Sequence, residues 1–405
     1  MNSRTDGLLS ALDAPRRKRH ESSDADRERL SQTRIILDGC GSIARPLAMS
    51  LAASGARRFV LSDPKTYVDR SVESQCEPHE VGRYKTEVVA SLLRERGAAV
   101  DVYTRDLSTV PEGIIAADSL VIASLDNARA TILSNRRVAR RGARLMKINI
   151  EPAFGVLAVR AFDYRRGVTT CCECGLTGRH YERQLHPRSC DGPGIGRRTN
   201  SPRWLSTSAA VIGVSAVLDL LGPACDAATW IDHEVQITLP ERRVVTSRLS
   251  PNPNCRCDHR QRWGDDGQIA TDGGTHSLDD LFVAAECSAA DAATVRFCQR
   301  VATRGRCQQC GRDAELIRWF TEFEQPLAWC EGCGGPVVAL PFFTYSELTA
   351  ARLKPVWHMP LSTWGVERFA LVEIAHGERR QAFVVDCTNQ CPGGPASTHC
   401  QGVTP

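Results

Sequence analysis

Short apolar runs alternate with amphipathic stretches through the first part of the chain. Runs typical of β-strands occupy residues 33–38, 57–63, 99–104, 119–124 and 144–150. Stretches with apolar positions at helical spacing occupy residues 46–54 and 83–94. Because strands that alternate with helices form parallel, doubly wound sheets, we expect an α/β fold of the Rossmann-like kind.

The pattern changes later in the chain. Residues 155–162 predict another strand, and residues 235–238 and 243–248 predict a hairpin. We therefore expect the sheet to be mixed at this edge. Residues 184–202 are rich in Gly, Pro and Arg and predict a long exposed loop, followed by a helix over 203–221.

The chain is longer than one hydrophobic core usually supports, because it has 405 residues. A polar linker divides it, and Ser277 is the N-cap that we expect for the helix after the linker. The predicted organisation is a polar N-terminal arm (1–32), a first domain (33–260), the linker (261–276), a small second domain (277–386) and a tail (387–405).

Composition and charge exclude several classes of partner. The net charge is only +4, and no long basic run with interleaved aromatic residues points to nucleic acid. No stretch approaches the ~20 consecutive apolar residues that a membrane helix needs, so no membrane partner is expected. The basic cluster at residues 16–19 is interpreted as part of a solvated arm. The N-terminus lacks the order of a signal peptide, and the expected location is cytoplasmic.

The chain has 18 cysteines, and a reducing compartment disfavours disulfides and favours metal sites or reactive thiols, of which we consider metal sites first. Cys171-x-x-Cys174 is typical of a zinc-knuckle half-site. Cys255-Arg-Cys257 is the candidate for its second half, and Cys257 with His259 is the alternative pairing. We therefore predict a first structural zinc site.

A second set of cysteines has regular spacing in both halves. It comprises Cys307-x-x-Cys310 and Cys330-x-x-Cys333. This spacing, with a hairpin-sized insert, is typical of a zinc ribbon, in which the metal replaces the core that a small domain lacks. We interpret the second domain as a small zinc-ribbon domain that docks a carrier or partner.

A glycine-rich turn follows the first predicted strand. Gly39 and Gly41 allow backbone amides to approach a phosphate, which then lies at a helix N-terminus. Asp63, at the end of the second strand, is placed to hold a ribose hydroxyl. These residues fit a nicotinamide or flavin site equally well, so they do not identify the nucleotide.

Two further features favour adenylation chemistry. Lys85 precedes a predicted helix, and Asp126-Asn127 follows a predicted strand. Adenylation requires a cation against the α-phosphate and a carboxylate that holds magnesium on the phosphates. Lys85 and Asp126 supply these two groups, which a dehydrogenase does not need.

At these residues the chain resembles the ubiquitin-activating-type superfamily that includes ThiF, MoeB and HesA, over about residues 33–259. The resemblance implies ATP-dependent adenylation of the C-terminal carboxylate of a ubiquitin-like or sulfur-carrier protein, or of a peptide, for sulfur transfer or modifier activation. It also implies a homodimer or heterodimer. The cofactors it implies are ATP, Mg2+ and Zn2+.

The resemblance assigns roles to individual residues. Asp63 would hold ribose, Lys85 the phosphates and Asp126 magnesium, and Asn135 would support the site. The full set of cofactor-binding residues that it implies is Gly39, Gly41, Ser42, Asp63, Lys85, Asp126, Asn127 and Arg129.

The chain also departs from the family pattern. Where the family has a phosphate-contacting arginine, this sequence has Ser74, and Ser71 replaces a family asparagine. The residues that we expect to substitute for the arginine are Arg70 or Arg83 nearby, or Arg27 or Arg29 from the arm across a dimer.

Many relatives carry a cysteine on a long crossover loop that takes the activated acyl group. Cys190 lies in the predicted loop among Arg188, Arg197 and Arg198, whose positive charges favour a thiolate. It is the candidate catalytic thiol, and a non-catalytic thiol is the alternative.

The sequence is also compatible with two other functions. One is an NAD-dependent oxidoreductase, because the glycine turn fits that cofactor. The other is a non-catalytic zinc scaffold or the partner subunit of a heterodimeric activating enzyme, which Ser71 and Ser74 favour.

Overall fold

The protein is described by a computed structural model. The described residues are 23–167, 170–178, 181, 201–222, 230–257, 259, 263, 277–287, 292–320, 326–367 and 369–385. Predictions on Cys190, on the tail and on all of the linker except Trp263 lie outside these residues. The chain divides into two units. Unit 1 is Met1–Ser108 with Ala117–His259, and unit 2 is Thr109–Ala116 with Arg260–Pro405.

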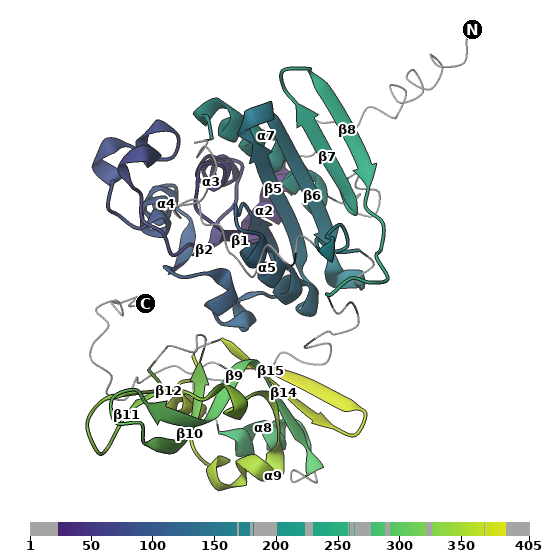
Figure 1. Cartoon of the computed structure of the whole chain (residues 1–405). Helices are drawn as coiled ribbons and strands as arrows, with labels where there is room; N and C mark the ends of the chain where they lie inside the picture. Colours follow the sequence, from purple (N-terminus) through teal and green to yellow (C-terminus); the bar gives the residue numbers. More distant parts are fainter. Residues whose placement is uncertain are drawn as a thin grey trace. The chain divides into compact units, whose positions relative to one another are not determined.

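Unit 1 is built on an eight-stranded mixed sheet with the strand order β3-β2-β1-β4-β5-β6-β7-β8 (Figure 1). The strands are β1 (Arg34–Asp38), β2 (Arg58–Ser62), β3 (Ala99–Tyr103), β4 (Leu120–Ala123), β5 (Arg144–Glu151), β6 (Val156–Asp163), β7 (His233–Thr238) and β8 (Arg243–Arg248). The strands from β3 to β5 are parallel, and those from β5 to β8 are antiparallel. The predicted mixed α/β sheet is confirmed.

The helices of unit 1 form two layers. Its α-helices are α2 (Ser23–Gln32), α3 (Ala44–Ala53), α4 (Lys85–Arg94), α5 (Ala128–Arg140) and α7 (Arg203–Leu221). Its 3₁₀ helices are η1 (Asp69–Glu73), η2 (Pro78–Glu80), η3 (Leu107–Thr109), η5 (Pro152–Phe154) and η6 (Tyr164–Arg166). Helix α3 contacts α4 and α7, and α2 contacts α7, so these four share a layer. Helix α3 connects β1 to β2, and α5 connects β4 to β5, which lies in the opposite direction along the sheet. Because such crossovers are right-handed, α5 lies on the other face of the sheet from α3.

Part of the predicted arm is ordered structure. Helix α2 contacts α7, and Leu30 is fully buried in the main core of unit 1. Arg27 lies against Gly55: a Cβ added to Gly55 would lie 2.5 Å from the Arg27 Cγ. Residues 23–32 of the predicted polar arm therefore form a largely polar helix that one apolar side chain anchors to unit 1.

Helix α7 is long and apolar enough to cross a membrane by length and composition alone, and half of its most apolar window is buried. Within unit 1 it contributes to the core beside α3 and β5. A Cβ on Gly213 would meet Ile148 Cδ1 at 2.6 Å and Leu47 Cδ1 at 3.1 Å. Its apolar character is thus accounted for by close packing against the sheet and α3.

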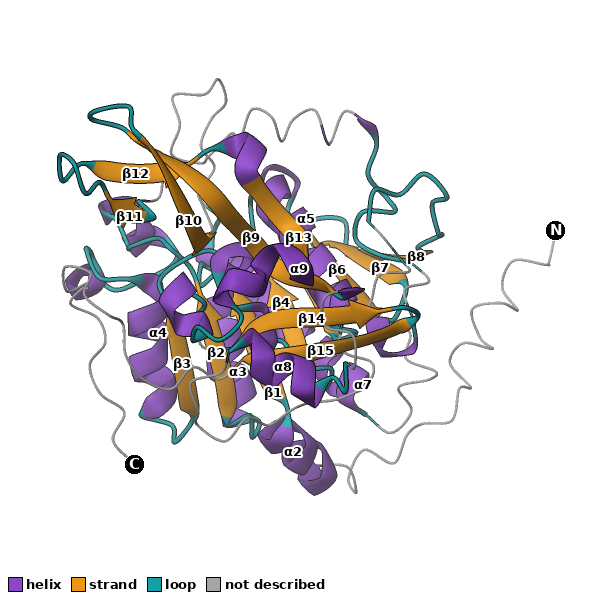
Figure 2. Cartoon of the chain, turned by 90° about the horizontal axis from the view of Figure 1, so that it is seen from below, coloured by secondary structure: helices purple, strands orange, loops and turns teal. Residues whose placement is uncertain are grey.

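Unit 2 is an antiparallel sheet of seven strands, five of which have the order β11-β12-β9-β14-β15, while β10 and β13 each pair with β9. Its strands are β9 (Thr294–Cys307), β10 (Asp313–Phe320), β11 (Ala328–Trp329), β12 (Pro336–Ala339), β13 (Thr344–Thr349), β14 (Ala370–His376) and β15 (Arg379–Val385). Strand β9 is the longest and pairs with β10, β12, β13 and β14 (Figure 2). The predicted zinc ribbon therefore corresponds to only one end of a larger sheet.

Helices pack on this sheet. They are α8 (Leu278–Ala284), α9 (Ala350–Leu353), η4 (Glu112–Ile114), η9 (Pro341–Phe343), η10 (Lys354–Val356) and η11 (Leu361–Trp364). Ser277 is the N-cap of α8, as predicted: its hydroxyl accepts a hydrogen bond from the Asp280 backbone N–H. Helix η4 comes from Thr109–Ala116, a segment that the sequence places within the first domain.

Gly113 holds this segment against the rest of unit 2. Its backbone N–H donates to the Phe369 carbonyl oxygen at 2.8 Å. An added Cβ would lie 2.4 Å from that oxygen and 2.7 Å from Val384 Cγ1. The close approach therefore requires glycine.

We expect Gly113→Ala to destabilise the protein by roughly 1–3 kcal/mol, the usual cost of overpacking. The backbone oxygen cannot move aside as a side chain can. Urea denaturation of wild type and variant measures the difference. Gly178→Ala is the matched control, because a Cβ there meets no atom within 4 Å. Equal losses in the two variants would contradict the prediction.

Candidate nucleotide and metal sites

The glycine turn follows β1 at the carboxyl edge of the parallel strands. Gly39 has φ +90°, and its backbone N–H donates to the Ser62 carbonyl at 2.8 Å. An added Cβ would meet Leu125 Cδ2 and the Ser124 carbonyl oxygen, each at 3.2 Å. The turn thus needs glycine for its conformation and for its close approach to the end of β4.

Asp63 ties the end of β2 to this turn. One carboxylate oxygen accepts from the Cys40 backbone N–H at 2.8 Å, and the other from the Lys65 N–H at 2.8 Å. The side chain is buried, with 7% exposed. The structure therefore places the predicted ribose-binding carboxylate directly against the glycine turn.

Lys85 is brought to the same turn. It is the first residue of α4, and its Nζ donates to Gln75 Oε1 at 3.0 Å. A Cβ on Gly41 would lie 3.9 Å from the same Gln75 oxygen. The Lys85 ammonium also lies 5.6 Å from the centroid of the Tyr67 ring. Gln75 thus links the Lys85 ammonium to the glycine turn.

The residues after β4 have different surroundings. Asp126 and Arg129 are exposed, while Asn127 is the N-cap of α5. The Asn127 side-chain oxygen accepts from the backbone N–H groups of Arg129 at 2.8 Å and Ala130 at 3.3 Å. Asn127 therefore fixes where α5 begins, a structural role that the sequence alone did not reveal. Ser42 lies in the turn before α3.

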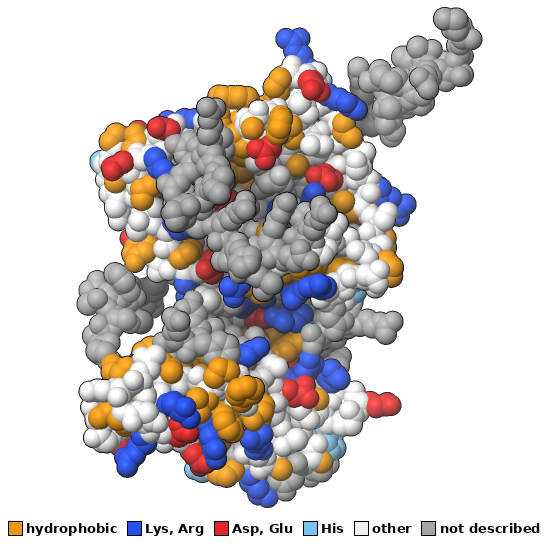
Figure 3. Space-filling model, viewed as in Figure 1, with side chains coloured by type: hydrophobic (Ala, Val, Ile, Leu, Met, Phe, Trp, Pro, Cys, Tyr) orange, Lys and Arg blue, Asp and Glu red, His pale blue; other side chains and the backbone are white. Residues whose placement is uncertain are grey.

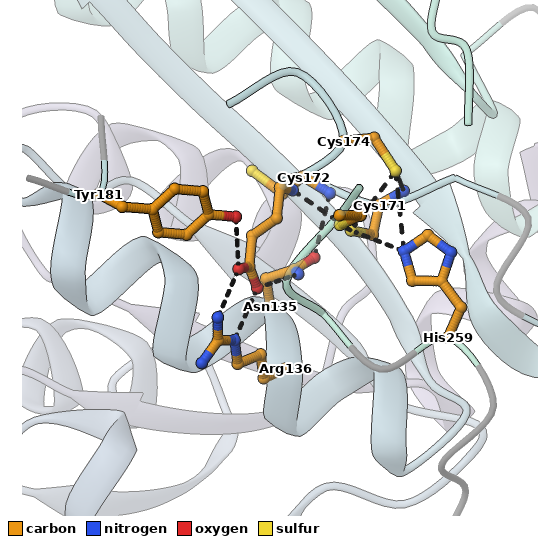
Figure 4. Close-up of polar contacts among 9 residues, drawn as sticks. Asn135, Arg136, Cys171, Cys172, Cys174, Tyr181 and His259 are labelled. Atoms are coloured by element: carbon orange, nitrogen blue, oxygen red, sulfur yellow. Dashed lines mark hydrogen bonds and ion pairs between the residues drawn. The ribbon is translucent and has the colours of Figure 1, made fainter. Parts of the chain in front are cut away.

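The first metal-ligand set is formed by Cys171, Cys174, Cys255 and His259, whose ligand atoms all lie within 4.8 Å of one another. The Sγ atoms of Cys171 and Cys255 are 3.5 Å apart, and His259 Nε2 lies 3.3 Å from Cys171 Sγ. Figure 4 shows the His259 ring directed at the sulfurs of Cys171 and Cys174. Three thiolates and one imidazole are a donor set that fits tetrahedral zinc.

Backbone amides support this set. The Cys171 N–H donates to Cys174 Sγ, and the Glu173 N–H donates to Cys171 Sγ, both at 3.3 Å. These bonds are the knuckle geometry that the sequence predicts. Cys257 is buried beside Cys171 but is not one of the four grouped ligands. His259 takes the fourth place instead.

The second set joins the end of β9 to the turn between β11 and β12. It comprises Cys307, Cys310, Cys330 and Cys333, with ligand atoms within 4.8 Å of one another. Cys307 and Cys333 sulfurs are 3.4 Å apart, and those of Cys310 and Cys330 are 3.6 Å apart. Backbone hydrogen bonds, foremost from Cys310, lower the pKa of Cys307 to about 6. A thiolate is the form that binds a metal.

These sites can be set beside known proteins. Residues 16–257 match the ThiF family. The chain belongs to the ThiF family. No match is found among curated proteins.

Solved structures similar to this ThiF-family chain share little sequence with it. E. coli MccB with ATP is 16% identical, with a TM-score of 0.46, over 57% of this chain and 68% of that one. A second E. coli MccB structure is 15% identical, with a TM-score of 0.47, and the match covers 60% of this chain and 69% of MccB. PaaA is 14% identical, with a TM-score of 0.45, and the match covers 56% of this chain and 69% of PaaA.

At Ser74, the position where this ThiF-family chain departs from the family pattern, two of the four candidate arginines have contacts elsewhere. The Ser74 hydroxyl is buried and has no hydrogen-bond partner among the described residues. Arg27 lies at Gly55, and Arg29 forms an ion pair with Asp26 at 2.5 Å within α2. Arg83 is exposed. Neither arm arginine is thus directed at the glycine turn of its own chain.

Arg45 is a cation that contacts Gln75, the residue after Ser74. It lies in the first turn of α3 and donates to the two Glu80 carboxylate oxygens at 2.6 and 3.0 Å. It also donates to the Gln75 carbonyl oxygen at 3.1 Å. Arg45 thereby holds Gln75 next to Lys85. No sequence pattern indicates this link, because the three residues are far apart along the chain.

Asp38 is a buried carboxyl directly before the glycine turn. Burial is the largest cause that raises its pKa, from 3.8 to about 7. The carboxylates of Asp106 and Asp63 raise it further, while the Ser134 hydroxyl and the Arg137 guanidinium lower it. The folded state therefore holds this proton more tightly than the unfolded chain does.

We expect the stability of the Asp38→Asn variant, relative to wild type, to increase by roughly 2–3 kcal/mol between pH 5 and pH 8. The stabilisation from the bound Asp38 proton is complete below about pH 4 and is lost as pH rises through about 7. Asparagine does not titrate and still accepts the Ser134 hydrogen bond. Chemical denaturation at both pH values measures the change, and a difference independent of pH would contradict it.

Proposed function

We propose that this chain uses ATP to adenylate the C-terminal carboxylate of a small carrier protein or peptide. The observation that carries the proposal is the contact of Lys85 with Gln75 beside Gly41, within a ThiF-family domain. A dehydrogenase turn needs no such cation. Membership in the ThiF family and this geometry support the same chemistry.

In the proposed reaction, a carboxylate oxygen of the acceptor attacks the α-phosphorus of ATP, and pyrophosphate leaves. The Lys85 ammonium stabilises the negative charge that develops on the α-phosphate. The backbone amides of the Gly39–Gly41 turn orient the phosphates, and the Asp63 carboxylate holds the ribose. Asp126 would hold Mg2+, which neutralises the leaving pyrophosphate when bound.

We further propose that the acceptor is a ubiquitin-like protein, a sulfur-carrier protein or a peptide, and that a thiol, amine or sulfur nucleophile takes the acyl group. Cys190 is the candidate thiol for this step. The enzyme would act in the cytoplasm as a homodimer or as one subunit of a heterodimer.

We propose Zn2+ at both cysteine sets. The ligand types support this, because three cysteines with one histidine, and four cysteines, are both ligand sets of structural zinc. Each set joins segments far apart in the sequence, so a metal would cross-link unit 1 at Cys171 and Cys255 and unit 2 at Cys307 and Cys330.

Unit 2 is proposed to dock the acceptor or another partner. It exposes Trp329 and Phe342, with 57% and 92% of their surfaces accessible. Arg304 lies over the Phe343 ring at 4.9 Å. Figure 3 shows orange hydrophobic side chains at the surface of this unit, with arginines and lysines among them. Exposed aromatic and arginine side chains are typical of interaction surfaces.

Calorimetric titration with MgATP, and separately with NAD, tests the proposed function without knowledge of the acceptor. We expect MgATP to bind and Asp126→Ala to weaken its binding. Binding of NAD but not of ATP would overturn the proposal in favour of an oxidoreductase.

The acceptor can then be sought by pyrophosphate exchange into ATP. Candidate peptides with free C-termini should support exchange, and the same peptides with amidated C-termini should not. Exchange that is independent of the free carboxylate would exclude the proposed reaction.

A scaffold without catalysis is the second candidate, and the buried, unpartnered Ser74 hydroxyl favours it. It predicts that partner binding survives Lys85→Ala or Asp126→Ala. The scaffold is supported if the folded, metal-bound wild type does not bind MgATP.

A further inference from the structure

Helix α5 presents an unusually polar face to the interior. Four polar side chains of this helix are buried: Thr131, Ser134, Asn135 and Arg137. Buried polar groups cost free energy unless each finds a hydrogen-bond partner, so their partners determine where the helix lies. Thr131 donates to the Asn127 carbonyl oxygen within the helix, and Arg137 donates to the Ser108 carbonyl oxygen. The partners of Ser134 and Asn135 come from the strand before the glycine turn and from the metal-ligand turn.

The link to the glycine turn runs through Ser134. Its hydroxyl donates to the buried Asp38 carboxylate. Asp38 is the last residue of β1, and Gly39 follows it directly. The Asp38 carbonyl oxygen also accepts from the Ser124 backbone N–H at 3.1 Å, which fixes the loop that leads to α5.

The link to the metal-ligand turn runs through the neighbouring residue, Asn135. Its side-chain N–H donates to Glu173 at 3.1 Å, and its oxygen accepts from the Tyr164 hydroxyl at 2.7 Å and the Cys172 N–H at 3.2 Å. Figure 4 shows Asn135 between Arg136 and the cysteines of this turn. Asn135, predicted to support the nucleotide site, is thus anchored to the metal-ligand turn.

Glu173 is the centre of this network. It is fully buried between the ligands Cys171 and Cys174. Arg136 donates to its two oxygens at 2.9 and 2.8 Å, and the Tyr181 hydroxyl donates at 3.0 Å. A bidentate arginine with two further donors fixes the carboxylate in one geometry. Any shift of the Cys171–Cys174 turn therefore moves the partners of Asn135 and Arg136 on α5.

We infer that Glu173 is a positioning residue that couples metal occupancy of the Cys171, Cys174, Cys255 and His259 set to nucleotide binding, through α5. The inference rests on the proposed function. Asn127 and Asn135 lie eight residues apart on the helix, about 12 Å at 1.5 Å per residue. The helix transmits the position of Glu173 to Asp126 at its start and, through Ser134, to the glycine turn.

The test is a double-mutant cycle on MgATP affinity, measured by calorimetry. Its variants are Glu173→Gln, Cys255→Ser and the double variant, with Glu234→Gln as the matched control on the β6–β7 pair Arg160–Glu234. Zinc content is determined on every sample. We expect each single variant to raise the MgATP dissociation constant roughly tenfold, and the double variant to raise it no further. The control should leave it unchanged.

Several outcomes would overturn the inference. Wild-type affinity in Glu173→Gln would do so, as would effects of the two single variants that add in the double variant. If Glu173→Gln does not fold, Arg136→Lys replaces it, because the Arg136 side chain is 36% exposed and only the bidentate contact is lost. Absence of MgATP binding by the wild type would instead overturn the proposed function itself.

Discussion

Replacing Lys85 with methionine is expected to raise the MgATP dissociation constant by roughly 10- to 100-fold, the usual cost of one hydrogen bond to a charged group. The Lys85 ammonium is the cation that the fold brings to the glycine turn, through Gln75. Methionine keeps the length of the side chain and removes its charge. Calorimetric titration of both proteins measures the change.

The matched control for this prediction is Lys354→Met. Lys354 belongs to unit 2 and lies 5.7 Å from the centroid of the Trp357 ring, so the same chemical change is made outside the part of the chain that matches the ThiF family. Its MgATP affinity should equal that of the wild type. A Lys85→Met variant that binds MgATP as tightly as the control would exclude Lys85 as the phosphate ligand.

The second large effect is expected from Cys171→Ser. We expect the bound zinc to fall from two ions per chain to one, and the free energy of unfolding to fall by more than about 3 kcal/mol. Cys171 is buried and touches both Cys255 and His259, so it joins the two halves of the set. A serine hydroxyl is a poor zinc ligand, and the cross-link is lost.

Elemental analysis and urea denaturation measure the two effects. Cys172→Ser is the control, because Cys172 is an equally buried neighbour outside the ligand set. It should retain both zinc ions and lose less stability than Cys171→Ser, because its only cost is one buried hydroxyl. Two ions per chain in Cys171→Ser would show that this set is not the zinc site.

The correct predictions concern local patterns. The strands of unit 1 and the helix over 203–221 follow from apolar periodicity, which burial on a sheet requires. The predicted positions of Gly39 and Asp63 come from a short motif, whose spacing is imposed by the geometry of strand, turn and helix. The cysteine spacings predict the tight turns of both ligand sets, because a Cys-x-x-Cys turn places two sulfurs on one metal.

The errors concern contacts between distant segments. The sequence offered Cys255 with Cys257, or Cys257 with His259, as the second half of the first set, and the fold groups Cys255 with His259 instead. Helix α2 has the composition of a polar arm, and only the contact of Leu30 with the core shows otherwise. The segment that contains Gly113 was assigned to the first domain, and the contact of its backbone with Phe369 places it in unit 2.

The sequence by itself determined the α/β class, the glycine turn and the three Cys-x-x-Cys turns, because each depends on residues within a few positions of one another. Only the tertiary structure decided that Arg45 and Gln75 hold Lys85, and that Glu173 meets Asn135. These are buried or partly buried polar contacts between residues 10 to 38 positions apart in the chain. No periodicity marks them, since a buried carboxylate acquires its partner only when the fold has excluded water from it.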